Sequence, residues 1–250
     1  MVQKKYPTSL IVGAGEIGSG LYKVLHDAYE ESVFIRDIEP KADLPKKVDY
    51  LHITFPYSNK FLEHVNTYIS IYNPRIVVIH STVPVGTTSK ISNCEAVHSP
   101  VRGKHPHLAD SIRTFVKFIG GNIHTCNEIA EYFINAKVAT IVCKDANTTE
   151  LGKIVSTTQY GWDIIQMKEI YRLCAQYNVP FSEVYTLFNE TYNKGYEAMD
   201  MGQYKRSILK YMPGEIGGHC VVNNSTLLDD IFTQMVKDFN GIYENEESEV

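Results

Sequence analysis

The sequence predicts an α/β fold, in which a doubly wound parallel sheet is followed by a smaller all-helical domain. Three observations predict it. An apolar segment at residues 8–12 runs directly into a glycine-rich turn that opens a helix. Strand-like and helical segments then alternate as far as Cys143. From Thr148 onwards, the apolar residues recur only at helical spacing.

The alternating segments are typical of a Rossmann-type sheet. The run at residues 75–80 contains four consecutive β-branched apolar residues, as expected of a central parallel strand covered on both faces. After the first strand, we expect strands at residues 33–35, 48–55, 75–80, 94–98, 114–119 and 139–143, and helices at 61–71 and 128–135.

The pattern changes near Asp145. No proline interrupts residues 148–178, and this apolar periodicity predicts a helix longer than most globular helices. Pro180 ends it, and a second helix is expected at 181–199. A loop rich in glycine and proline at 212–220 precedes a last helix. We therefore expect a sheet domain at 1–144, a helical domain at 145–240 and an acidic, disordered tail at 241–250.

The composition is that of an ordinary globular protein, with 44% hydrophobic and 21% charged residues. A net charge of −5 argues against a nucleic-acid partner, which would require a basic face. No apolar run approaches the ~18–20 residues that cross a bilayer, so no membrane partner is expected. The five cysteines show no CxxC spacing, which suits a reducing compartment. We expect a cytoplasmic protein.

The glycine-rich turn predicts a dinucleotide site. In the G-x-G-x-x-G pattern, Gly13 permits the tight turn, Gly15 lets the backbone approach a pyrophosphate, and Gly18 allows close helix–strand packing. Asp37 follows the second strand, where a carboxylate would bind the ribose hydroxyls of NAD and repel the phosphate of NADP. Arg36 weakens that preference. The expected cofactor-binding residues are Gly13, Gly15, Glu16, Ile17, Gly18, Asp37, Thr54, Pro56, Ser81, Thr82 and Val83.

Three further segments carry residues suited to catalysis. Residues 81–88 follow the fourth strand, at the edge where open α/β sheets bind ligands. Lys153 stands among apolar neighbours, where an ammonium can stabilise developing negative charge; a surface lysine with a packed stem is the alternative. Cys220 follows two glycines and His219, so its thiol is a candidate nucleophile for an aldehyde, with His219 as base. A small buried cysteine in a tight loop is the other interpretation.

Together these segments resemble the UDP-glucose/GDP-mannose dehydrogenase family, within the group that includes the 6-phosphogluconate and 3-hydroxyisobutyrate dehydrogenases. The shared motifs are the glycine turn, S-T-V-P-x-G-T-T, T-x-E-L-x-K and P-G-x-x-x-G-G-H-C. The resemblance implies an NAD domain, a helical dimerisation domain and hence a homodimer. It also implies oxidation of nucleotide sugars for polysaccharide biosynthesis. In that chemistry Cys220 would capture an aldehyde as a thiohemiacetal, Lys153 would stabilise the oxyanion, and Thr82 would lie at the cofactor.

The sequence departs from the family at three positions. Thr157 stands four residues after Lys153, where the family has asparagine, and Asn224 stands four residues after Cys220, where it has aspartate. Val101 occupies the place of a glutamate implicated in hydrolysis, and a valine cannot transfer protons. The resemblance also ends near Leu228, which suggests a truncated form without the family's second nucleotide-binding domain. We expect an altered substrate site.

In place of the glutamate segment the sequence has a basic cluster, formed by Arg102 and Lys104 with His98, His105 and His107. Its side chains suit an anionic substrate such as a carboxylate or phosphate. A metal site formed by His98, His105 and His107 with His219 and Cys220 is a weaker hypothesis, so no metal is expected. The candidate substrate-binding residues are His98, Arg102, Lys104, Gly217 and Gly218.

Three functional hypotheses remain open at this stage. The first is an NAD-dependent oxidoreductase that acts on an alcohol or aldehyde of a sugar-like or small anionic substrate, with Cys220 and Lys153 central. The second is a β-hydroxyacid dehydrogenase or reductase, in which Lys153 is the general acid/base and Cys220 is incidental. The third is a non-catalytic regulatory protein that binds NAD.

Overall fold

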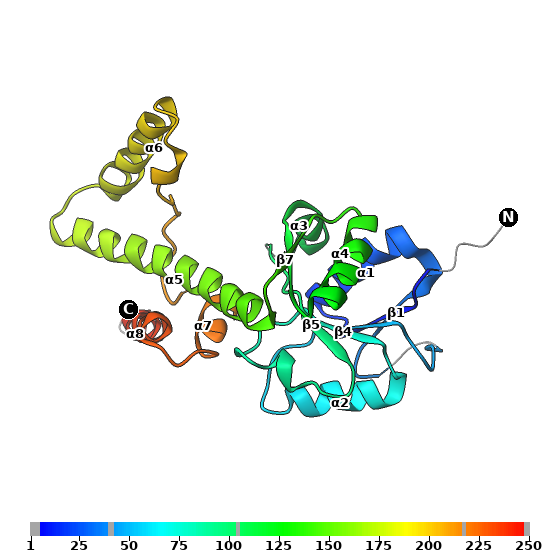
Figure 1. Ribbon diagram of the computed structural model, residues 1–250. Coiled ribbons are helices and arrows are strands. Elements are labelled where there is room, and N and C mark those ends of the chain that lie inside the picture. Colours follow the sequence, from blue (N-terminus) through cyan, green and yellow to red (C-terminus); the bar gives the residue numbers. More distant parts are fainter. Residues whose placement is uncertain (1–5, 40–42, 104–105, 217–218, 248–250) are drawn as a thin grey trace. The chain divides into compact units, whose positions relative to one another are not determined.

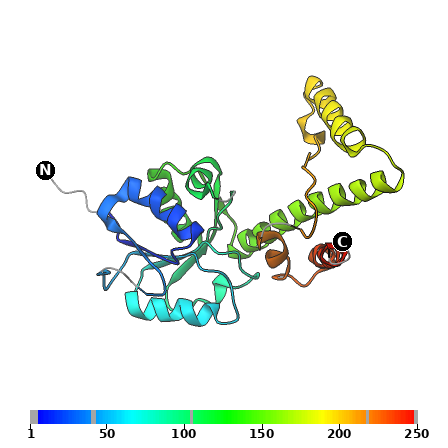
Figure 2. The same cartoon turned by 180° about the vertical axis from the view of Figure 1, so that it is seen from behind.

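The structure is a computed structural model. It divides into two compact units, Met1–Lys153 (unit 1) and Ile154–Val250 (unit 2), which Figures 1 and 2 show from opposite sides. The division falls inside one long helix, beyond residue 144 where the sequence placed it. The described residues are 6–39, 43–103, 106–216 and 219–247, without the side chains of 219 and 245–247.

Unit 1 is built on a seven-stranded sheet with the order β2-β1-β3-β4-β5-β6-β7. The first five strands run parallel to one another. The sequence predicted every strand to within a few residues, and the α/β class is confirmed. The strands are β1 Ser9–Val12, β2 Val33–Arg36, β3 Tyr50–Ile53, β4 Ile76–Ile79, β5 Glu95–His98, β6 Lys117–Gly121 and β7 Thr140–Cys143.

Strand β6 departs from the fully parallel sheet that the sequence predicted. It pairs antiparallel with β5, and β7 then runs parallel to β6. The cause is the connection between β5 and β6. There the chain forms helix α3 (Leu108–Thr114), which the sequence did not predict and which packs on α1 (Glu16–Tyr29), with Leu108 directly against Gly20. Because α3 does not cross back over the sheet, the chain re-enters it from the carboxyl end of β5.

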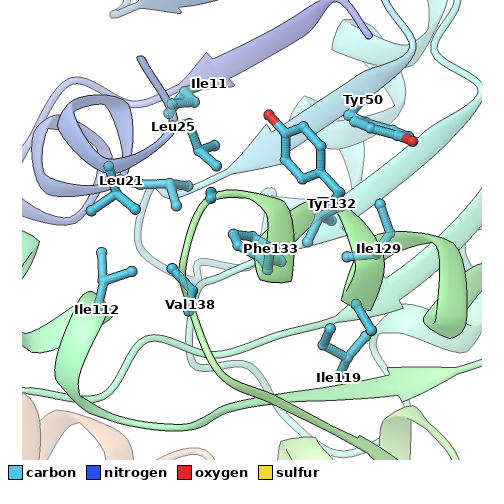
Figure 3. Close-up of a cluster of buried hydrophobic side chains, with 14 of the residues drawn as sticks. Ile11, Leu21, Leu25, Tyr50, Ile112, Ile119, Ile129, Tyr132, Phe133 and Val138 are labelled. Atoms are coloured by element: carbon cyan, nitrogen blue, oxygen red, sulfur yellow. The ribbon is translucent and has the colours of Figure 1, made fainter. Parts of the chain in front are cut away.

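Helices cover both faces of this sheet (Figure 1). On one face, α1, α3 and α4 (Ile123–Asn135) form a core in which Leu21, Leu25 and Phe133 pack against Ile11 and other strand residues (Figure 3). On the other face, α2 (Phe61–Tyr72) packs against the alternate side chains of β1, β3 and β4. Alternation along short, fully buried strands supplies apolar side chains to both faces.

Unit 2 is helical. Helix α5 (Ala146–Gln176) spans the division between the units and is followed by a π-helical turn (Ser182–Leu187) and α6 (Phe188–Ala198). Helices α7 (His219–Ser225) and α8 (Ile231–Glu247) complete it. The core of unit 2 is a cluster of Ile164, Ile165, Met167, Tyr185, Ile216, Val221, Val236 and Tyr243. Short 3₁₀ turns in the two units lie at Glu30–Ser32, Thr88–Lys90 and Gly202–Tyr204.

The prediction of a disordered tail is wrong for residues 241–247. Helix α8 continues to Glu247, so residues 241–247 are helical. Tyr243 explains this, since its ring is buried in the unit 2 core and its hydroxyl donates to the Glu169 carboxylate at 2.9 Å. One anchored aromatic side chain therefore extends the helix into the acidic segment. In the part of the chain that the structure describes, we find no helix with the length and apolarity needed to span a membrane.

Candidate functional site

The glycine turn joins β1 to α1, and two of its glycines are required by packing. Gly13 has a φ of +105° and its N–H donates to the Arg36 carbonyl at 2.9 Å. A Cβ at Gly18 would lie 1.7 Å from the Gly13 carbonyl oxygen. Any side chain at either position would therefore distort the turn.

Gly15 is different, because no protein atom requires a glycine there. Its φ of −68° suits any residue, and a Cβ would meet nothing within 4 Å. Gly15 is the N-cap of the 14-residue helix α1, and it has no side chain that could cap the first N–H groups. Open space beside Gly15 at this helix N-terminus fits a phosphate that approaches the backbone. Glu16 is exposed beside it and Ile17 is half-buried.

Thr54 fixes the turn from the end of β3. Its buried hydroxyl lies 2.8 Å from both the Val12 and the Gly13 carbonyl oxygens. Because β1 lies between β2 and β3, the turn stands where the strand order reverses, which is the ligand-binding crevice of open α/β sheets. Thr54 thus supports the turn from beneath, and the neighbouring Pro56 is exposed.

Arg36 and Asp37 lie at the end of β2. The Arg36 guanidinium donates to the Tyr72 hydroxyl at 2.8 Å and to the Ile38 carbonyl at 2.9 Å, and it lies over the Tyr68 ring. These contacts engage Arg36 within the protein. Asp37 is exposed, and one of its oxygens accepts from the Ile38 N–H. The arrangement leaves a carboxylate, and not a guanidinium, at the position suited to a ribose.

The loop after β4 is tied to the start of α5 by a buried carboxylate. Glu150 is fully buried; one oxygen accepts from the Gly86 N–H at 2.6 Å and the other from the Thr88 N–H and hydroxyl at 2.8 and 2.7 Å. These three hydrogen bonds satisfy both oxygens of a buried carboxyl group. Two of the motifs singled out in the sequence are thereby held together within unit 1.

His98 joins the same loop to α5 from the end of β5. The Ser81 carbonyl only accepts, so His98 Nε2 donates to it at 3.1 Å, and His98 Nδ1 then accepts from the Thr149 hydroxyl at 2.9 Å. Burial lowers the pKa of His98 to about 3. The side chain is fully buried with both nitrogens bonded, so the expectation that His98 contacts a substrate is wrong: it is a neutral support.

The remaining residues of the cofactor loop have unequal exposure. The Ser81 hydroxyl donates to the Phe55 carbonyl at 2.6 Å, and Val83 is fully buried in the core beneath α2. Thr82 is half-buried between them. Ser81 and Val83 therefore shape the loop, and Thr82 is its side chain best placed to meet a ligand.

Unit 2 brings together two of the positions that depart from the family. The Asn224 amide of α7 donates to the Thr157 hydroxyl of α5 at 3.3 Å. Gly161 permits this approach, because a Cβ there would lie 2.8 Å from a Val221 methyl. Cys220 precedes Val221 in α7 and is exposed. The buried-cysteine alternative therefore does not hold.

The other candidates belong to different units or lie outside the described residues. Lys153, half-buried, ends unit 1, whereas Cys220 belongs to unit 2. Arg102 is exposed and lies over the rings of Phe115 and Phe118, 5.5 Å from each centroid. Among the described residues, no group of three or more His, Cys, Asp or Glu is arranged to hold a metal. Outside the description lie Lys104, His105, Gly217, Gly218 and the side chain of His219.

Sequence reasoning missed several buried polar residues that hold the site. Glu150 and Thr149 belong to a motif that the sequence highlighted, yet their tethering role depends on contacts with distant loops. His52 and Lys117 lie within otherwise apolar strands and are almost fully buried. A lone polar residue in an apolar strand is the signal that would have found them.

Known proteins resemble this chain in both sequence and fold. No family model matches the chain. UDP-N-acetyl-D-mannosamine dehydrogenase from Methanocaldococcus jannaschii is 27% identical over an alignment of 221 positions, which covers 83% of this chain and 46% of the relative. The enzyme of that name from Methanococcus maripaludis is 24% identical over 224 residues, 86% and 48% of the two chains. The chain thus spans about half the length of these curated relatives, and the resemblance drawn from the motifs is confirmed.

Solved structures agree on the fold. UDP-D-ManNAc dehydrogenase from Pyrococcus horikoshii superposes with a TM-score of 0.76 at 17% identity, covering 93% of this chain and 68% of that one. The 3-hydroxyisobutyrate dehydrogenase of Mycobacterium tuberculosis gives 0.73 at 12% identity and covers 96% and 94%. At such identities the likeness concerns the arrangement of the chain alone.

Proposed function

We propose that this chain, a relative of the nucleotide-sugar dehydrogenases, is an NAD-dependent oxidoreductase acting on a CH–OH or aldehyde group of a sugar-like or small anionic substrate. The observation that carries the proposal is the open helix end at Gly15, beside packed Gly13 and Gly18. Such a turn at the strand-order reversal supports dinucleotide binding. When bound, NAD supplies hydride transfer at its nicotinamide ring.

NAD is proposed over NADP because of the end of β2. The exposed Asp37 carboxylate would accept hydrogen bonds from a ribose and repel a phosphate. Arg36, which sequence reasoning left as a counterargument, is bonded to Tyr72 and Ile38. To bind a phosphate, Arg36 would have to give up these contacts.

Lys153 and Cys220 are the proposed catalytic residues. Lys153 would stabilise the oxyanion that develops on the substrate, or exchange a proton with its hydroxyl. The Cys220 thiol, exposed on α7, would add to an aldehyde carbon, forming a C–S bond while the thiol proton passes to the carbonyl oxygen. His219 is the proposed base for that proton.

At the altered positions the groups that would hydrolyse a thioester are replaced, so a two-electron reaction, in which the addition of Cys220 to an aldehyde stays reversible, is proposed beside complete oxidation to an acid. Hydrolysis of a thioester requires a group that activates water. Val101 is buried where the family has glutamate, and Thr157 and Asn224, which bond to each other, do not ionise at neutral pH. For the same reason a β-hydroxyacid dehydrogenase, with Lys153 as acid/base and Cys220 incidental, is the second candidate.

A turnover assay with NAD, a panel of nucleotide sugars and a panel of small β-hydroxy acids tests this proposal. Wild type should reduce NAD with at least one substrate, and Lys153→Ala should lower kcat by about 10²–10⁴-fold, whereas Lys144→Ala, on an exposed residue, should not. Loss of activity in Cys220→Ala supports the thiol step, and full activity supports the second candidate. NAD binding without turnover on any substrate would contradict both and favour a non-catalytic protein.

We also propose a homodimer and a cytoplasmic location. Large exposed apolar side chains concentrate in unit 2, where the family relationship places a dimer interface. All five cysteines are free, which suits a reducing compartment. A role in polysaccharide biosynthesis is proposed from the same relationship, on the basis that its relatives oxidise nucleotide sugars.

A further inference from the structure

A chain of buried polar side chains crosses the middle of the sheet in unit 1. His52 of β3, His80 at the end of β4 and Lys117 of β6 are 0%, 1% and 4% exposed. His52 Nδ1 lies 2.9 Å from His80 Nε2, and His80 Nδ1 lies 2.8 Å from the Ser99 carbonyl oxygen. The Lys117 ammonium nitrogen lies 2.8 Å from the same oxygen and 3.5 Å from the Pro100 carbonyl.

The hydrogen-bond chemistry fixes the direction of this chain. The Ser99 carbonyl only accepts, so His80 Nδ1 carries the proton and His80 Nε2 accepts from His52 Nδ1. His52 Nε2 is then an acceptor, and it is buried without a hydrogen-bond partner. This assignment requires neutral rings, and burial supplies the reason, because it lowers the pKa of His52 to about 3 and that of His80 well below its ordinary value.

The surroundings of Lys117 favour its neutral amine. The groups that face it are His52, His80 and His98 from three strands, the Phe133 ring of α4 at 5.1 Å, and Lys153 from α5. The histidines are neutral and Lys153 is a like charge, so none of these groups supplies a negative charge. Burial, reinforced by Lys153, lowers the pKa of Lys117 to about 7.

Lys117 also holds the start of the segment that follows β5, at Ser99 and Pro100. The carbonyls of Ser99 and Pro100 begin the segment that leaves β5 and leads to exposed Arg102, at the ligand-binding edge of the sheet. The same segment is bonded to β4 and its end through Ser99 N–H to Ile79 and Val101 N–H to His80. Opening this segment would release Lys117 to water.

We propose that Lys117 is a proton-linked clamp, which closes residues 99–102 onto the sheet as a neutral amine and releases them when it binds a proton. The direction follows from linkage. A lysine in water binds protons more tightly than the buried one, so the open segment takes up protons and the closed segment becomes more stable as pH rises above about 7. This inference does not depend on the proposed enzymatic function, because it needs no substrate.

Amide hydrogen exchange of the full chain between pH 7 and pH 9 tests the clamp. Where local opening does not depend on pH, the exchange rate of an amide rises about tenfold per pH unit, because intrinsic exchange accelerates by that factor. The clamp opposes this rise, since it lowers the equilibrium constant for opening by up to about tenfold per pH unit. The Ser99 and Val101 amides of wild type should therefore exchange at nearly constant rates. The Ile91 amide, whose bond to the Thr88 carbonyl lies in another turn, should accelerate normally.

Two variants sharpen the comparison. Lys117→Met keeps the length of the side chain without its titration, and its Ser99 and Val101 amides should accelerate about tenfold per pH unit. Lys90→Met, on an exposed lysine of unit 1, should behave as wild type. If Lys117→Met fails to fold, the wild-type contrast between Val101 and Ile91 still decides. Parallel acceleration of those two amides in wild type would overturn the proposal.

Discussion

Gly15 is the residue of the turn at which we propose that a ligand, and not the fold, requires glycine. Gly13 and Gly18 are fixed by contacts within 3 Å, but the space beside Gly15 holds no protein atom. Its φ of −68° imposes no need for glycine either. Open space alone does not imply a ligand, since Gly152 and Gly195 are open as well. Gly15 carries the functional proposal because it is open at the N-terminus of α1, where the strand order reverses.

A methyl group at Gly15 should therefore separate binding from stability. We expect Gly15→Ala to lower NAD affinity by roughly 10- to 100-fold, because the Cβ would occupy the space over the helix end. Stability should change by at most about 1 kcal/mol, since alanine is only a poorer N-cap. Calorimetric titration with NAD and thermal unfolding provide the two measurements.

Two other glycines serve as references for this variant. Gly195→Ala, at an open position in α6, should keep wild-type NAD binding. Gly18→Ala should fail to fold properly, because its Cβ would collide with the Gly13 carbonyl. Unchanged NAD affinity in Gly15→Ala would remove the dinucleotide from this end of α1.

Sequence patterns singled out residues whose proposed role is local, and missed those whose role depends on strand order. The glycine turn and Asp37 were recognised because their neighbours in sequence define them. His52 and His80 are 28 residues apart, and they meet only because β3 and β4 are adjacent. His98 was expected at a ligand for its chemistry, but burial makes it a support. Burial and adjacency are properties of the assembled sheet.

At the scale of elements, the direction of a strand was harder to predict than its existence. The short β-branched runs located all seven strands, since periodicity and composition act locally. The reversal of β6 depends on helix α3, which packs on α1 near Gly20. The seven residues of α3 are too few for a clear apolar period, so no local sequence pattern predicted the reversal of β6.

The contact between α5 and α7 depends on Gly161. A Cβ there would lie 2.8 Å from a Val221 methyl and 3.2 Å from two Val236 methyls. We expect Gly161→Ala to destabilise the chain by about 1–3 kcal/mol through overpacking, despite the better helix propensity of alanine. The midpoint of urea unfolding, followed by circular dichroism, measures this.

The same helix offers the matched substitution. At Gly152 an added Cβ would meet nothing within 4 Å, so Gly152→Ala should stabilise by up to about 1 kcal/mol. In the double variant Gly161→Ala/Val221→Ala, the smaller side chain of α7 should recover part of the loss. Equal stabilisation by alanine at positions 161 and 152 would show that α7 does not pack closely on α5.

At the scale of the whole molecule, most of the large exposed apolar side chains among the described residues lie in unit 2. The exposed side chains near the end of α5, in the π-helical turn and at the start of α6 include Leu173, Tyr177, Leu187 and Phe188, and the last two are 51% and 71% exposed. Large apolar side chains left exposed in this number favour an interaction site. A second copy of the chain is the proposed partner.

A charge placed on that surface tests the homodimer. We expect Phe188→Glu to shift the chain from dimer to monomer, because a carboxylate in an apolar interface would lose its hydration. Ile123→Glu, at a comparably exposed isoleucine of unit 1, should remain dimeric. Light scattering coupled to size-exclusion chromatography gives the mass of each form. A monomeric wild type across the micromolar range would contradict the dimer, and dimeric Phe188→Glu would place the interface elsewhere.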